Sequence, residues 1–268
     1  MRLLRFKEPF LAVAFPLAAL LVFVIVWEVV VRFVGIPSYI LPLPVNIVKE
    51  IYFEAGLLLE HSWITALEAF LGLVAGAALG IITAMIIVWS KILGRTVLPL
   101  VVLTKAFPKV AIAPLLVIWF GFGIFPKIFV TFLICYFPIV INVVAGLISV
   151  DSELIDLGKS MSASKMQIFT KVRIPNSLPY FFTGLKLASV LALIGAIVGE
   201  FVGGDAGLGF LILVANERMN TSLFFACVVI LTAIGLSFFY IATGLENIAV
   251  PWKPTIEDEG KTLTETAI

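Results

Sequence analysis

Long apolar runs separated by short polar segments dominate the sequence. Several of these runs are almost free of charge, and each has about the 20 residues that a helix needs to cross a membrane. They cover residues 9–27, 65–89, 128–150, 180–200 and 222–245. A further apolar segment is interrupted, because the stretch Lys105–Lys109 separates residues 96–104 from residues 110–126. The pattern predicts an all-α membrane protein with about six transmembrane helices.

The longest polar interruption, residues 151–179, is itself patterned. Leu154, Leu157 and Met161 recur at helical spacing, which predicts a short helix with one apolar face. Ser164 and Gln167 have the spacing of a capping box, so we expect a second short helix to begin at Ser164 after a turn at residues 162–164.

Pro175 follows this second predicted helix. The residue before a proline disfavours helical geometry. We therefore expect Ile174 to be extended, the second helix to end there and the next span to begin near Tyr180.

The composition agrees with a membrane protein. Hydrophobic residues make up 62% of the chain and charged residues 13%, whereas soluble domains have about 25% charged residues. Cys135 and Cys227 both lie in apolar runs, which favours small core residues over a disulfide or metal pair. The single His61 cannot build a metal site alone, and the chain contains no recognisable nucleophile–base set. We expect no metal site, no covalent catalysis and no nucleic-acid partner.

The distribution of Lys and Arg predicts the orientation of the chain. They are concentrated in alternate segments beginning with the N-terminus, which predicts by the positive-inside rule that both termini and the loop 151–179 are cytoplasmic. The predicted organisation is an N-terminal tail with an uncleaved first span, an outer loop with an interfacial helix at residues 45–59, a core with five spans, and a cytoplasmic tail. These units cover residues 1–34, 35–64, 65–249 and 250–268.

Three glycines in the second predicted span, Gly72, Gly76 and Gly80, form a small-xxx-small ladder. Such a ladder lets another helix approach closely. The ladder can pack against a helix of the same chain or of a second subunit, or it can contact a transport pathway.

The interrupted third span and the end of the fifth span are candidates for a solute pathway, because broken helices in membranes line cavities. The third span contributes Lys105, Phe107, Pro108, Lys109 and Pro114, and both prolines favour a break. An alternative for the two lysines is that they extend toward the cytoplasmic interface.

In the fifth span, Glu200 lies deep in an apolar run with no obvious nearby cation. An ionisable residue inside a membrane is a functional candidate. The alternative is a position at the outer boundary, since Gly203, Gly204 and Asp205 follow at once.

The loop 151–179 resembles the cytoplasmic EAA loop of ABC importer permeases, whose pattern is E-A-A-x3-G-x9-I-x-L-P. Asp156, Leu157 and Gly158 stand at the E-A-A positions, and Ser162 stands where the pattern has glycine, a residue that adopts a left-handed turn freely. Val172 and the pair Ile174-Pro175 complete the spacing.

The resemblance extends over about residues 40–249. Several segments are similar to the nitrate/sulfonate/taurine branch of binding-protein-dependent inner-membrane permeases. They are Phe107–Leu115, Trp119–Gly123, Pro175–Tyr180 and Glu200–Gly209.

This resemblance implies a type I ABC importer fold in the bacterial inner membrane, with residues 65–249 as the permease core. It implies a homodimer, two separate cytoplasmic ATPase subunits that bind ATP and Mg²⁺, and an extracytoplasmic solute-binding protein. The chain itself would be a non-catalytic, multi-pass subunit without a cofactor. The residues expected to couple it to the ATPase are Asp156, Leu157, Gly158, Lys159, Ser162, Ala163, Ser164 and Pro175.

The expected solute is a small organic anion of the sulfonate, taurine or nitrate kind, favoured by Lys105 and Lys109. An aromatic vitamin precursor, a pyrimidine or a flavin, is the alternative, favoured by the phenylalanines around the broken span. A proton-coupled secondary transporter using Glu200 would leave the patterned loop unexplained. A membrane enzyme or scaffold would need a catalytic set that the sequence lacks.

Overall fold

The computed structural model describes residues 7–252, and within that range the chain is helical with no strand. The predicted N-terminal tail up to residue 6 and the predicted tail from residue 253 lie outside the described residues. The helices are α1 (Lys7–Val34), α2 (Pro44–Phe53), α3 (Ala55–Trp89), α4 (Lys91–Ala106), α5 (Lys109–Phe120), α6 (Ile124–Ile148), α7 (Ser152–Ser160), α8 (Lys165–Ile168), the π-helical turn η1 (Phe169–Arg173), α9 (Ile174–Gly203), α10 (Leu208–Glu217) and α11 (Thr221–Ala249).

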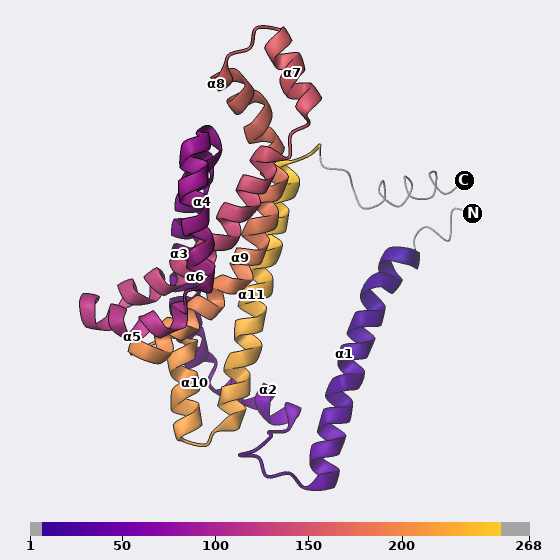
Figure 1. Cartoon of the computed structure of the whole chain (residues 1–268). Coiled ribbons are helices and arrows are strands. Elements are labelled where there is room, and N and C mark those ends of the chain that lie inside the picture. The colour runs from indigo at the N-terminus through magenta and orange to yellow at the C-terminus, as the bar shows by residue number, and fades with distance from the viewer. Residues whose placement is uncertain (1–6, 253–268) are drawn as a thin grey trace.

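The long helices run along one common direction, and the two ends of the molecule differ (Figure 1). The helices α7 and α8 project from one end, while α2 and α10 lie at the other. Five helices of the described chain are long and apolar enough to cross a membrane, and the bent pair α4–α5 is a sixth candidate. The predicted fold class, an all-α membrane protein with about six spans, is confirmed.

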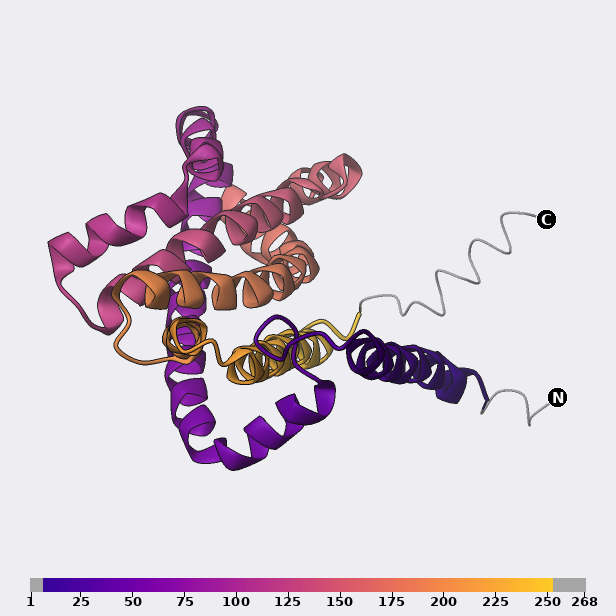
Figure 2. The ribbon, with the colours of Figure 1, turned by 90° about the horizontal axis from the view of Figure 1, so that it is seen from below.

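The first span, α1, stands apart from the other helices in two perpendicular views (Figure 1 and Figure 2). Only 6% of its apolar window is buried. Its main anchor is at its C-terminal end, where the Trp27 and Phe225 rings lie 5.5 Å apart.

The core is formed by α3, α6 and α9, and small residues let these helices pack closely. A Cβ atom at Gly76 would lie 3.0 Å from the Cβ of Cys135, and one at Gly80 would lie 2.9 Å from a methyl group of Ile139. The glycine ladder of α3 therefore faces α6 of the same chain. Cys135 and Cys227 are buried free thiols, as the sequence predicts.

The break in the third span lies at Pro108, where the chain turns by 92° between α4 and α5. Phe107 adopts an extended conformation, with φ −71° and ψ 128°, as expected before a proline. The expectation of a second break at Pro114 is wrong, because α5 continues through that residue.

The prediction that Pro175 ends a helix is also wrong. Ile174 is helical, with φ −63° and ψ −51°, and α9 begins there rather than near Tyr180. Pro175 occupies the first turn of α9, where its missing N–H costs little and its fixed φ suits a helix. The π-helical turn η1 ends directly before α9 and joins α8 to α9 without an extended segment.

Other boundaries differ from the sequence prediction in smaller ways. The helix expected at residues 45–59 ends at Phe53, and α3 begins at Ala55 rather than at Thr65. The short apolar helix α10 (Leu208–Glu217), which follows the loop 204–207, is not predicted by the sequence pattern.

Candidate functional site

The coupling loop, defined here as residues 151–173, begins with α7. The carboxylate of Asp151 accepts a hydrogen bond from the backbone N–H of Glu153, at 3.3 Å, and so caps the helix. None of the residues of α7 is buried. Leu154, Leu157 and Met161 are 55%, 58% and 76% exposed, so their shared apolar face has no partner within the described chain. A predominantly apolar helix face that is exposed in this way is typical of a surface that binds another protein.

The turn after α7 is a Schellman motif. The N–H of Ala163 bonds to the carbonyl of Gly158 and the N–H of Ser162 to that of Lys159, both at 2.9 Å. Ser162 is left-handed, with φ 59°. The serine therefore adopts the conformation that glycine, the residue of the EAA pattern at this position, takes freely.

The second short helix, α8, begins with the predicted capping box. Ser164 accepts from the N–H of Gln167, and the Gln167 side chain accepts from the N–H of Ser164 at 2.7 Å. Gly158 faces this helix, and a Cβ atom there would lie 3.5 Å from Ile168, an ordinary contact. The two short helices thus pack against each other at a glycine.

The coupling loop is fastened to the ends of the long helices. Lys165 donates to the carbonyl of Trp89, at 2.8 Å, and its ammonium lies 4.6 Å from the centre of the Trp89 ring. Phe169 packs edge-on against the same ring. Arg173 donates to the carbonyl of Leu147, at 3.1 Å, near the end of α6. A displacement of the loop would therefore act on α3, α6 and α9 together.

The broken span lines two cavities. One, of about 520 Å³, contains both Lys105 and Lys109 together with Phe107 and residues of α6 and α9. The Lys105 ammonium lies 5.7 Å from the centre of the Phe137 ring. The other cavity, of about 660 Å³, lies beside α5 and contains Phe107, Pro108 and Lys109. Four of the six predicted pathway residues therefore gather around the break.

The other two predicted pathway residues lie elsewhere. Pro114 is exposed on α5, and Glu200 is only 1% exposed, in the last turn of α9. Glu200 accepts a hydrogen bond from the Thr65 hydroxyl, at 2.6 Å, and another from the N–H of Gly209. The prediction that Glu200 lines the pathway draws no support from this placement.

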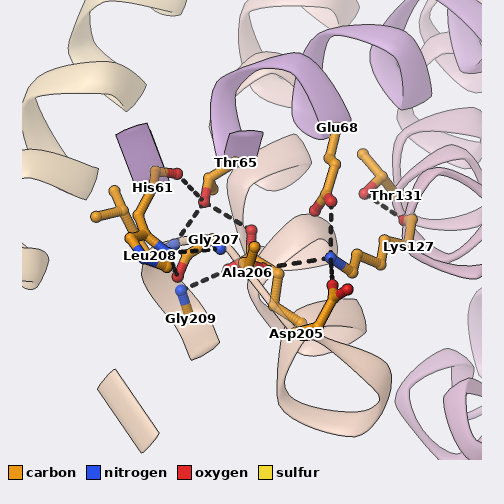
Figure 3. Close-up of polar contacts among 11 residues, drawn as sticks. His61, Thr65, Glu68, Lys127, Thr131, Asp205, Ala206, Gly207, Leu208 and Gly209 are labelled. Carbon is orange, nitrogen blue, oxygen red and sulfur yellow. Dashed lines mark hydrogen bonds and ion pairs between the residues drawn. The ribbon is translucent and has the colours of Figure 1, made fainter. Parts of the chain in front are cut away.

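Beside Glu200 lies a buried ion pair that the sequence analysis missed. Lys127 and Glu68 have side chains only 3% and 1% exposed, and the Lys127 Nζ lies 2.9 Å from the Glu68 Oε1 (Figure 3). Lys127 also donates to the carbonyl of Ala206, at 3.3 Å. The expectation that Glu200 has no cation nearby is therefore corrected. Glu68 inside the second predicted span was the available signal.

Further contacts join the same network to the loop 204–207. The N–H of Leu208 donates to Thr65 at 2.8 Å, and the N–H of Gly207 donates to the Nδ1 of His61 at 2.9 Å (Figure 3). These contacts satisfy backbone groups at the start of α10. The network fixes the loop between α9 and α10 to the first part of α3, at the end of the molecule opposite the coupling loop.

A bundle of apolar helices with one broken span and a projecting, anchored two-helix loop has the architecture of a membrane transport subunit. The chain belongs to the family described as "Binding-protein-dependent transport system inner membrane component", whose model matches residues 76–247. It is therefore a multi-pass permease of the ABC importer class, and the resemblance noted in the sequence is confirmed.

Among curated relatives, the chain is 37% identical to the formylaminopyrimidine transport permease protein ThiX of Halalkalibacterium halodurans, over 89% of this chain and 95% of the relative. It is 34% identical to the riboflavin transport system permease protein RibX of Chloroflexus aurantiacus, over 93% and 92%. It is 29% identical to the putative aliphatic sulfonates transport permease protein SsuC of Bacillus subtilis, over 88% and 86%.

A solved structure of the MetNI methionine ABC transporter in an inward-facing conformation has the same fold. The TM-score is 0.63 at 20% sequence identity, and the match covers 73% of this chain and 97% of that one.

Proposed function

We propose that this chain forms the solute pathway of an ATP-driven importer as a homodimer, and that each copy binds a separate cytoplasmic ATPase through its coupling loop. The observation that carries the proposal is the exposed apolar face of α7, formed by Leu154, Leu157 and Met161. Family membership supports the same assignment. The permease itself carries out no chemistry, and ATP and Mg²⁺ belong to the ATPase.

The anchoring of the coupling loop supports a mechanical role. Contacts from Lys165 and Arg173 hold the loop to the ends of α3 and α6, and η1 continues directly into α9. Closure of the ATPase subunits would therefore tilt three packed spans as a unit. Such a rigid-body movement is one of the established ways in which a distant site switches a two-state protein.

The pathway is proposed to run along the face that carries the break at Pro108. Lys105, Phe107 and Lys109 line a cavity there, and Lys105 and Phe107 are exposed in the single chain. A second copy packed against this face would enclose the cavity between the two subunits. An extracytoplasmic binding protein would deliver the solute to the opposite end from the coupling loop.

The proposed solute is a planar aromatic compound of the pyrimidine or flavin kind. Its support is the similarity to the permeases named for formylaminopyrimidine and riboflavin, at 37% and 34% identity. The rings of Phe107 and Phe137 at the cavity offer stacking surfaces for such a compound. The sequence pattern by itself, through Lys105 and Lys109, favours an anion.

A small organic anion is the second candidate. Lys105 and Lys109 line the same cavity and would attract a sulfonate or carboxylate. The relative named for aliphatic sulfonates, at 29% identity, supports this candidate.

The proposal is tested by purifying the permease with its candidate ATPase and reconstituting both in liposomes with the binding protein. ATP hydrolysis is expected to rise when the binding protein carries a transported solute. Uptake driven by a proton gradient, without ATP or the ATPase, would contradict the assignment.

Transport assays in the same liposomes distinguish the two candidate solute classes. Riboflavin, a formylaminopyrimidine and taurine are offered in turn with their binding proteins. Transport of an uncharged aromatic compound is expected to be lost in Phe107→Ala and retained in a Lys105→Gln/Lys109→Gln variant. The reverse pattern, with taurine transported and the lysine variant inactive, would establish the anion instead.

A further inference from the structure

A basic cavity of about 500 Å³ lies between the coupling loop and the junction of α3 with α4. Four cationic side chains contribute to its wall: Lys91, Lys159, Lys165 and Arg173. Among the described residues that line it, none is acidic. Such a concentration of one sign of charge around a cavity attracts an anion.

The neighbouring contacts leave most of this charge uncompensated. Lys159 pairs with Asp156 at 2.8 Å, but both side chains are more than half exposed, and exposed pairs are weak. Lys165 and Arg173 donate to backbone carbonyls at the ends of α3 and α6, where the helix dipole offsets only about half of a unit charge at each end. The cavity therefore holds a fixed positive charge.

The rest of the wall is apolar and aromatic. Val88, Ile155 and Ile168 line the cavity, as do Trp89 and Phe169, whose rings lie 5.3 Å apart. Trp89 is the last residue of a predicted span, and tryptophan is enriched where spans meet the polar surface of a membrane. The cavity thus combines cations with an apolar wall at the end of a span.

We propose that this cavity binds the phosphate group of an anionic phospholipid from the cytoplasmic leaflet. The cations hold the phosphate, and the apolar wall contacts the glycerol and the first carbons of the acyl chains. Basic pockets between spans on the cytoplasmic side take anionic headgroups in this way. A bound lipid braces the coupling loop against the α3–α4 junction, so the lipid composition sets how firmly the loop is held.

The test uses the full-length permease in detergent and counts bound lipids by native mass spectrometry. Phosphatidylglycerol and phosphatidylcholine with the same acyl chains are titrated separately. The wild type is expected to retain phosphatidylglycerol preferentially. A Lys91→Gln/Lys165→Gln variant is expected to lose at least about tenfold in affinity, since each cation near a membrane surface contributes on the order of a fivefold change.

Two further variants make the comparison specific. Lys91→Gln alone removes no described hydrogen bond and is expected to lose about fivefold. An Arg95→Gln/Lys171→Gln variant removes the same charge from exposed positions on α4 and the coupling loop that do not line the cavity. It is expected to retain the lipid like the wild type.

Three outcomes would overturn the proposal. Equal retention of the two lipids, or equal losses in both double variants, would show non-specific charge attraction. Displacement by millimolar inorganic phosphate, with no gain from the lipid, would identify a free-anion site. Loss of ATPase co-purification in Lys91→Gln/Lys165→Gln, with lipid retention unchanged, would assign the cavity to an acidic side chain of the ATPase.

Discussion

Lys127 and Glu68 form an ion pair of 2.9 Å between α6 and α3, and both side chains are almost completely enclosed by protein. Lys127 also reaches the carbonyl of Ala206 and lies 3.8 Å from the exposed carboxylate of Asp205. One buried cation thus links two spans to the loop 204–207. The arrangement fixes the end of the molecule at which a binding protein is proposed to act.

Removing one partner of this pair is expected to destabilise the protein strongly. Lys127→Met leaves Glu68 buried without its cation, and breaking a buried pair in this way costs about 3–5 kcal/mol. The free energy of unfolding, measured by SDS titration in detergent micelles, checks this value. The double variant Glu68→Leu/Lys127→Met is expected to recover much of the loss, because no buried charge is then left alone.

A matched control replaces an exposed lysine, on α2, at the same end of the molecule. Lys49→Met is expected to change the free energy of unfolding by less than about 0.5 kcal/mol. A loss for Lys127→Met as small as that of the control would contradict the role assigned to the pair.

The glycine ladder of α3 gives a prediction about packing. A Cβ atom at Gly76 would stand 3.0 Å from the Cβ of Cys135, a contact tight enough that α3 or α6 must shift by a few tenths of an ångström. Gly76→Ala is therefore expected to lower the free energy of unfolding by about 1–3 kcal/mol. Gly244→Ala is the control, because nothing lies within 4 Å of a Cβ atom there. Equal effects of the two changes would contradict the close approach of α3 and α6.

At Ser162, in contrast, a substitution is expected to stabilise the local structure. It is left-handed, with φ 59°, and an L-residue in that conformation is disfavoured by about 1 kcal/mol relative to glycine. Ser162→Gly is expected to slow hydrogen exchange at the amides of residues 162 and 163, which bond back to α7. Ser162→Ala removes the hydroxyl but keeps the strain, so it should give no such slowing. Faster exchange in Ser162→Gly would argue against the Schellman turn.

Sequence patterns were sufficient for the features that depend on local chemistry. The capping box at Ser164 and Gln167, the break at Pro108 and the number of spans all follow from residues adjacent in the chain. The error at Pro175 had a local cause as well: a proline in the first turn of a helix is compatible with that helix, and a π-helical turn before it removes the need for an extended segment.

Features that depend on contacts between residues far apart in the sequence could not be predicted from local patterns. Glu68 and Lys127 are 59 residues apart in sequence, and each lies near the end of a span. Their pairing depends on the close approach of α3 and α6. Glu200 likewise has its hydrogen-bond partners because Thr65 and the start of α10 pack against it. Sequence analysis found the charged residue in α9 but not its surroundings.

The apolar face of α7 is proposed to transmit the movement of the ATPase to the spans. This role is tested most directly by binding-protein-stimulated ATP hydrolysis of the reconstituted complex carrying Leu157→Asp. The control is Ser152→Asp, which places the same acidic side chain at an exposed position on the opposite face of α7. Leu157→Asp is expected to abolish stimulation and ATPase co-purification, while Ser152→Asp is expected to keep both. Full stimulation in Leu157→Asp would contradict a coupling role for this face.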